Sequence, residues 1–147
     1  MSDYFKAIVG RENRKRNDND FYPTPGLALH ALARVCDIPT NIWEPAAGRG
    51  HIAKELEKIG KNVYASDLNT YNNPLVSIHI ADFLNSETPK KCDSIITNPP
   101  YMHNMAENFI LNALSREEIT FIAMLCRMQF INSERRYKNI YSQSPPN

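Results

Sequence analysis

The stretch "NIWEPAAGRGHIAKELEKIGKNVYASD" (residues 41–67) carries the pattern that decides the fold. It opens with a short apolar strand, "NIWE", which runs into a turn that contains glycine. "HIAKELEKIG" follows as an amphipathic helix whose apolar residues, including Leu56 and Ile59, share one face, and Gly60 marks its end. "NVYAS" then predicts a second strand. A strand, a helix and a strand in this order predict two parallel strands joined by a crossover helix.

The same alternation of strands and helices continues on both sides of this stretch. Further strands are predicted at residues 75–80, 92–97 and 118–126, and further helices at residues 26–36 and 105–115. Thr24 is a suitable N-cap for the first of these helices, and Pro25 is a suitable first residue. The sequence therefore predicts an α/β fold with a mostly parallel sheet and helices on both of its faces.

The composition is that of one ordinary globular domain. The chain has 147 residues, of which 42% are hydrophobic and 22% are charged. Its start has no apolar core of the signal-peptide type, no apolar run is long enough for a membrane span, and the three cysteines show no C-x-x-C spacing. These features predict a soluble, cytoplasmic protein with no membrane partner. The four histidines show no ligand spacing, so no metal site is predicted.

The charged residues divide the chain into an arm and a domain. Residues 1–19 end in the polar run "RENRKRNDN" and are predicted to form a flexible arm, whereas residues 20–147 form the domain. Because the net charge is only +1, any binding to nucleic acid has to rest on local patches. Candidates for phosphate contact are Arg11, Arg14, Lys15, Arg16, Arg127, Arg135, Arg136 and Lys138. The alternative reading of such charge runs is a solvated surface.

A glycine loop follows the first strand of the quoted stretch. Gly48, Gly50 and Ala53 fit the pattern G-x-G-x-x-A at the start of a helix, where free N–H groups can face a ligand. Glu44 lies directly before this loop, and its carboxylate would repel a pyrophosphate but attract a cation. The loop therefore predicts a site for a ligand that carries positive charge.

Acidic residues also stand at the ends of the next two strands. Asp67 comes about 20 residues after the glycines, where a carboxylate can hold ribose hydroxyls. Asp82 and Phe83 follow the third strand, and an acceptor beside an aromatic ring suits the amino group and the face of an adenine. Each acid alone could be a cap or a turn residue. Together they predict a pocket for an adenosine with a positive, phosphate-free tail, and S-adenosylmethionine fits that description.

The fourth strand ends in "NPPY", residues 98–101. Asn98 precedes a proline and is pushed to extended geometry, and Pro99 and Pro100 can continue neither a helix nor a sheet. The Asn98 side-chain oxygen and the Pro99 carbonyl are then two acceptors side by side, which suits an amino group with two protons. Tyr101 offers a ring on which a planar base could stack. The alternative reading is a rigid turn from strand to loop.

These motifs resemble those of the amino-methyltransferases that use S-adenosylmethionine. "EPAAGRG", "SDLN", "ADF" and "NPPY" occur in the same order, and "DFYPTP" resembles the motif upstream of the glycine loop in adenine-specific DNA methyltransferases of phages and prophages. The resemblance runs from about residue 20 to the end of the chain. It implies a Rossmann-like methyltransferase fold. Fewer strands are visible than the family's sheet contains, so the final strands are expected to be missing.

The resemblance also implies a role for each motif. It places Tyr22, Thr24, Glu44, Ala46 and Gly48 around the methionine end of the cofactor, Asp67 at its ribose, and Asp82 and Phe83 at its adenine, with Gly50 as a further cofactor-binding residue. It places Asn98, Pro99, Pro100 and Tyr101 at the target base. The implied reaction is methyl transfer to the exocyclic amino group of a flipped adenine in DNA. Two alternatives stay open: a cofactor-binding remnant without activity, and an enzyme that acts on RNA or on protein glutamine, since such enzymes share "NPPY".

Overall fold

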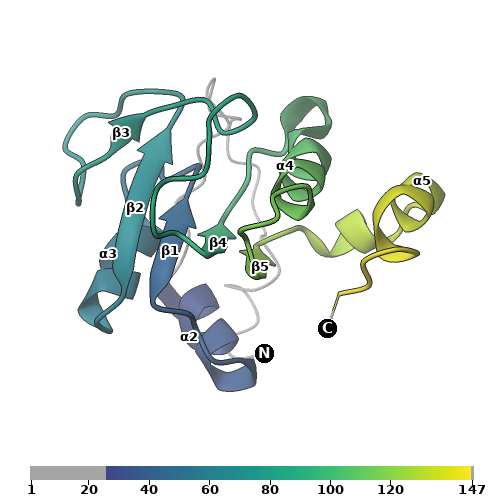
Figure 1. The fold of residues 1–147 in the computed structure, drawn as a ribbon, viewed down its shortest axis with the longest axis horizontal. Helices are drawn as coiled ribbons and strands as arrows, with labels where there is room; N and C mark the ends of the chain where they lie inside the picture. The colour runs from purple at the N-terminus through teal and green to yellow at the C-terminus, as the bar shows by residue number, and fades with distance from the viewer. Residues whose placement is uncertain (1–25, 147) are drawn as a thin grey trace, which may run out of the picture.

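The computed structural model describes residues 26–146 of the chain (Figure 1). The predicted arm at residues 1–19, together with Tyr22 and Thr24, lies outside the described residues. The elements are α2 (Gly26–Val35), β1 (Asn41–Glu44), α3 (His51–Lys58), β2 (Asn62–Asp67), β3 (His79–Ile80), β4 (Ser94–Thr97), η1 (Met102–Asn104), α4 (Met105–Leu114), β5 (Phe121–Met124), η2 (Met128–Ile131), α5 (Glu134–Arg136) and η3 (Tyr137–Tyr141).

The strands form one sheet of five strands in the order β3-β2-β1-β4-β5, and every neighbouring pair is parallel. The predicted α/β class with a parallel sheet is therefore confirmed. The chain moves outward from β1 to β3 and then returns to the other side of β1 with β4. The order of the strands thus reverses between β1 and β4, and such a switch point leaves a crevice at the carboxyl ends of the strands.

Helices cover both faces of the sheet because successive strand residues point to opposite sides. Ile42 and Ile96 share a buried cluster with Leu29 of α2 and with Leu56 of α3. The neighbouring strand residues, among them Trp43, belong to a second buried cluster. That cluster contains Trp43, Ile95, Phe83, and Phe109 and Ala113 of α4. The helices α2 and α3 therefore lie on one face and α4 lies on the other, as the sequence predicted (Figure 1).

The structure differs from the sequence prediction at several strand boundaries and at one helix residue. The strand predicted at residues 118–126 is confined to Phe121–Met124. The strand expected at residues 75–80 is reduced to the two residues of β3, because Leu75 donates its N–H to the Arg49 carbonyl at 2.8 Å instead of pairing in the sheet. Ile59 was expected on the buried face of α3 but is 52% exposed. It follows the last residue of α3 and precedes Gly60, whose φ of +79° ends the helix.

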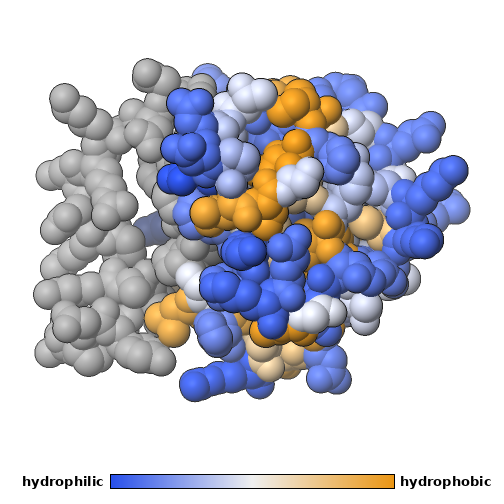
Figure 2. Space-filling view, turned by 90° about the vertical axis from the view of Figure 1, so that its left-hand side faces the viewer, coloured by the Kyte–Doolittle hydropathy of each residue, from blue (hydrophilic) through white to orange (hydrophobic). Residues whose placement is uncertain are grey.

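The side of the molecule that carries β3 exposes apolar side chains. Leu68, Leu75 and Ile80 lie in or next to the segment between β2 and β3, and each is exposed. Figure 2, which views the molecule from this side, shows apolar atoms gathered between polar ones. None of the helices in residues 26–146 is long and apolar enough to cross a membrane.

Candidate functional site

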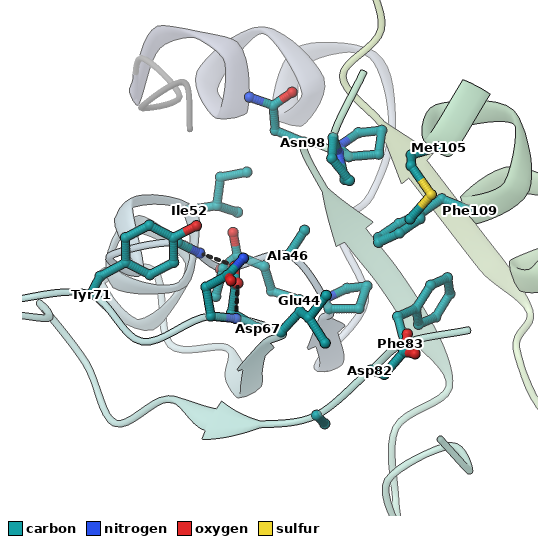
Figure 3. A pocket seen from close by; sticks show the side chains of 18 of the residues that line it. Glu44, Ala46, Ile52, Asp67, Tyr71, Asp82, Phe83, Asn98, Met105 and Phe109 are labelled. Atoms are coloured by element: carbon teal, nitrogen blue, oxygen red, sulfur yellow. Dashed lines mark hydrogen bonds between the residues drawn. The ribbon is translucent and has the colours of Figure 1, made fainter. Parts of the chain in front are cut away.

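A cavity of about 200 Å³ lies at the carboxyl ends of the strands, at the switch point between β1 and β4 (Figure 3). Of the predicted site residues, it is lined by Glu44, Ala46, Gly48, Asp67, Asp82, Phe83, Asn98, Pro99, Pro100 and Tyr101. Gly50 is not among the lining residues. In Figure 3, Asn98 lies across the cavity from Glu44 and Asp67, so the proline turn and the acidic strand ends face each other.

The glycine loop takes a backbone conformation that other residues adopt at a cost. Gly48 has a φ of +57° and Gly50 a φ of +85°, both in the left-handed region. A Cβ added at Gly50 would lie 2.5 Å from Cγ2 of Val76. Gly50 therefore does not touch the cavity but allows the β2–β3 segment to pack over the loop, which is a supporting role.

Glu44 ends β1 and is buried, with 1% of its surface exposed. Its Oε2 accepts a hydrogen bond of 2.8 Å from the backbone N–H of Ala53, which belongs to the first turn of α3. Burial raises the pKa of Glu44 well above its usual value, and the nearby Asp67 carboxylate adds to this shift. A cation in the cavity would favour the ionised form of Glu44 and would oppose the shift.

Asp67 is the last residue of β2 and is 6% exposed. Its Oδ2 accepts the N–H of Gly48 and its Oδ1 accepts the N–H of Asn69, both at 2.8 Å. Burial raises the pKa of Asp67 above its usual value. A carboxylate has about four acceptor positions, so Asp67 can tie the glycine loop to β2 and still accept hydrogen bonds from a ligand.

The structure gives Asp82 and Phe83 different surroundings from those expected. Asp82 is partly exposed and shapes a turn: its Oδ1 accepts the N–H of Leu84 at 3.1 Å, and its Oδ2 accepts the side-chain amide of Asn85 at 2.6 Å. Phe83 was expected to cover the face of an adenine. Phe83 lines the cavity but is only 2% exposed, because its ring packs edge-on against Trp43 and tilted against Phe109. Phe83 therefore forms part of the cavity floor.

Arg116 fixes the loop that carries Asp82 and Phe83. Its Nη2 donates to the carbonyl oxygens of Phe83 and Ser86 at 2.8 Å and 2.9 Å, and its Nη1 donates to Thr88 Oγ1 at 3.0 Å. The guanidinium also lies 4.9 Å from the ring centroids of Trp43 and Phe83. One side chain from the region after α4 thus fixes the loop at residues 83–88, which begins at the cavity-lining Phe83.

The proline turn continues directly from β4. Pro99 is fully buried, and Asn98 lines the cavity on the side across from Glu44 and Asp67 (Figure 3). The Tyr101 hydroxyl lies 2.6 Å from Asn98 Oδ1 and 2.6 Å from the Leu125 carbonyl oxygen. A hydroxyl has one proton, so it can donate to either acceptor. The hydroxyl therefore links the proline turn to the chain just after β5 through one of these two acceptors at a time.

Sequence reasoning missed ten residues that line the cavity. They are Pro45, Ala47, His51, Ile52, Leu68, Asn69, Tyr71, Ala81, Met105 and Phe109. Half of them (Pro45, Ala47, His51, Leu68 and Ala81) are direct chain neighbours of predicted residues and could have been found from that adjacency. Tyr71 lies in a loop without periodicity, and Met105 and Phe109 enter from α4. The positions of Met105 and Phe109 depend on how α4 packs on the sheet.

Within residues 26–146, no group of three or more His, Cys, Asp or Glu side chains is arranged to hold a metal ion. Comparisons of the chain with protein-family models, with curated proteins and with solved structures found no match.

Proposed function

We propose that this chain transfers a methyl group from S-adenosylmethionine to the exocyclic amino group of adenine in DNA, on a Rossmann-like methyltransferase fold. One observation carries the proposal. The "NPPY" turn at residues 98–101 and the acidic strand ends Glu44, Asp67 and Asp82 line the same cavity, although they lie far apart in the sequence. The residues that we assign to a cationic nucleoside and those that we assign to an amino group therefore line one cavity.

The strand order supports the proposed fold. The order 3-2-1-4-5 is that of the first five strands in doubly wound nucleotide-binding sheets, whose ligands bind where the order reverses. The cavity occupies that place. Residues from both sides of the switch point line this cavity. They lie at the ends of β1 and β2 on one side and at the end of β4 on the other.

The residues at the cavity fit the charge of the proposed cofactor. Glu44 and Asp67 present two carboxyl groups, and the cofactor would bring a sulfonium and an ammonium. When bound, S-adenosylmethionine supplies the methyl group in activated form, as a sulfonium. The volume of about 200 Å³ is below the range of about 300–1,000 Å³ that is usual for small-molecule sites, so the ligand would extend through the open mouth.

The proline turn supplies what the acceptor needs. The amino nitrogen of adenine shares its lone pair with the ring and is a poor nucleophile. Asn98 Oδ1 and the Pro99 carbonyl oxygen would each accept one of its protons, which draws the nitrogen toward a tetrahedral shape and frees the lone pair. Both oxygens would also stabilise the positive charge that grows on this nitrogen as the new C–N bond forms. The methyl–sulfur bond would break in the same step and leave a neutral thioether, and the methylated nitrogen would then lose one proton to water. Holding the two reacting groups in line lowers the barrier further.

The choice of DNA rests on the resemblance of "DFYPTP" and the glycine loop to adenine-specific enzymes. In a duplex the amino group is hidden, so the base has to be flipped out at a cost of a few kcal/mol. Stacking of the flipped base on Tyr101 would offset about 1–3 kcal/mol of that cost.

An acceptor screen tests the proposed function. The purified chain is incubated with methyl-labelled S-adenosylmethionine and, separately, with unmethylated DNA, RNA and unfolded protein. We expect label in DNA alone. Label in RNA or protein would contradict the DNA assignment and favour the corresponding class of amino-methyltransferase. Cofactor binding by calorimetry without label in any acceptor would contradict catalysis and indicate a chain that only binds the cofactor.

A further inference from the structure

The cationic residues near the C-terminus have different surroundings. Three of the four that the sequence suggested for phosphate contact are held by other parts of the protein. Arg135 donates to Glu107 at 2.5 Å, Arg136 lies 4.1 Å from the ring centroid of Phe130, and Lys138 pairs with Glu134 at 2.7 Å. The contact of Arg135 with Glu107 anchors the segment after β5 to α4. The contact of Arg136 with Phe130 lies within that segment. The fourth cation, Arg127, lies next to the proline turn.

Arg127 contacts the residue proposed to stack on the target base. Its guanidinium carbon lies 4.8 Å from the centroid of the Tyr101 ring, and the side chain is exposed. Two residues earlier, the Leu125 carbonyl is within hydrogen-bond distance of the Tyr101 hydroxyl. The segment at residues 125–127 therefore holds Tyr101 at both its ring and its hydroxyl.

We propose that Arg127 is a positioning residue of the target-base site, which fixes the Tyr101 ring and binds a backbone phosphate of the DNA strand that carries the flipped base. The inference rests on the proposed function. A guanidinium can stack through its flat face and donate hydrogen bonds in its own plane at the same time. Stacking of Arg127 on the Tyr101 ring is therefore compatible with a contact between its guanidinium N–H groups and a phosphate.

The geometry favours a phosphate of the flipped nucleotide or of its neighbour. A base is joined to its phosphate through the sugar, so a cation that touches the ring beneath the base lies close to that part of the backbone. Lysine carries the same charge but has no flat face for stacking. Arg127→Lys and Arg127→Gln therefore separate the two parts of the role.

The test is DNA binding over a series of salt concentrations, measured by fluorescence anisotropy with an unmethylated duplex. For Arg127→Gln we expect the slope of log K against log[salt] to fall in magnitude by about 0.9, the value for one phosphate contact. Arg127→Lys should keep the wild-type slope. In single-turnover methyl transfer, both variants should lose about 10-fold in kcat/KM for DNA because neither braces the Tyr101 ring, with KM for the cofactor unchanged.

The matched control is Arg34→Gln, which removes the same charge from the exposed last turn of α2. That turn leads into the start of β1 and so lies at the opposite edge of the sheet from the cavity. An unchanged slope in Arg127→Gln, an equal change in Arg34→Gln, or a wild-type chain that does not bind DNA would overturn the inference. DNA binding with the expected slopes but without any methyl transfer would contradict the proposed function and leave the phosphate contact of Arg127 standing.

Discussion

At the scale of single residues, Glu44 is the side chain whose surroundings are least expected for an ionised group. Its carboxyl is buried, accepts one backbone N–H, and lies near a second carboxyl group, that of Asp67. The glycine loop follows Glu44 directly, and the first turn of α3 donates the N–H of Ala53 to its carboxyl. A buried carboxyl with a raised pKa beside a cavity is typical of a functional site.

This surrounding predicts a dependence of stability on pH. The pKa of Glu44 is raised in the folded chain, so between the ordinary value of about 4.3 and the raised value the folded state binds more protons than the unfolded state. The free energy of unfolding should therefore fall as pH rises through that window. In Glu44→Gln the fall should be smaller. Urea denaturation at a series of pH values measures both, and identical slopes for the two chains would contradict the account.

Glu44 also predicts proton release when the cofactor binds. A cation favours the ionised carboxylate, so binding should release a proton that calorimetry detects in two buffers of different ionisation enthalpy. Glu44→Gln should abolish this release and weaken binding by roughly 10- to 150-fold, the equivalent of about 1.5–3 kcal/mol for a hydrogen bond to a charged group. Unchanged affinity in this variant would exclude Glu44 from the site.

Tyr101 is the other residue whose role can be divided experimentally. Tyr101→Ala removes the ring and should lower kcat/KM for DNA by about 5- to 150-fold, which corresponds to about 1–3 kcal/mol of stacking. Tyr101→Phe keeps the ring and loses only the hydroxyl, so it should stay within about 10-fold of the wild-type value. Full activity in Tyr101→Ala would exclude the stacking role.

At the scale of elements, the junction between β1 and α3 shows how backbone geometry places the site. Gly50 and Gly60 flank α3 and both have positive φ, but only a Cβ at Gly50 would meet Val76, at 2.5 Å. Gly60→Ala should cost about 1–2 kcal/mol for the left-handed conformation alone. Gly50→Ala should cost about 1–3 kcal/mol more, because the added carbon overpacks the contact.

Chemical denaturation of both glycine variants tests this difference. The double variant Gly50→Ala with Val76→Ala removes the far end of the Val76 side chain and should recover part of the additional loss. Equal destabilisation in Gly50→Ala and Gly60→Ala would show that Val76 places no constraint on the loop.

The sequence predicted those elements whose pattern is local. The spacing of hydrophobic residues predicted β1, α3 and β2. The candidate site residues were predicted from the rule that the carboxyl ends of parallel strands meet at one edge of the sheet. The strand at 75–80 was predicted too long, because Val76 packs on Gly50 across the β2–β3 connection. The burial of Phe83 was also beyond local reasoning, since it depends on Phe109 of α4 and on Arg116. Contacts between distant segments decided each of these differences.

At the scale of the whole molecule, the described part is a parallel sheet with both faces covered and a site at one edge. Its last strand, β5, pairs with β4 alone among the described strands. The segment after β5 returns past the proline turn and is then fixed to α4 by Glu107, which binds Arg135. Leu125 and Arg127 thus lie beside Tyr101 of the proline turn, and the C-terminal segment is held against α4.

The central claim is methyl transfer to adenine, and one measurement tests it most directly. The purified chain is incubated with S-adenosylmethionine that carries a trideuterated methyl group and with unmethylated DNA, and the digested nucleosides are analysed by mass spectrometry. The variant Asn98→Ala removes one proposed acceptor, and Asn108→Ala is the matched control on the exposed face of α4. We predict trideuterated N-6-methyladenine from the wild-type chain and from Asn108→Ala, and none from Asn98→Ala. No methyladenine from a folded wild-type sample, or an undiminished amount from Asn98→Ala, would contradict the account.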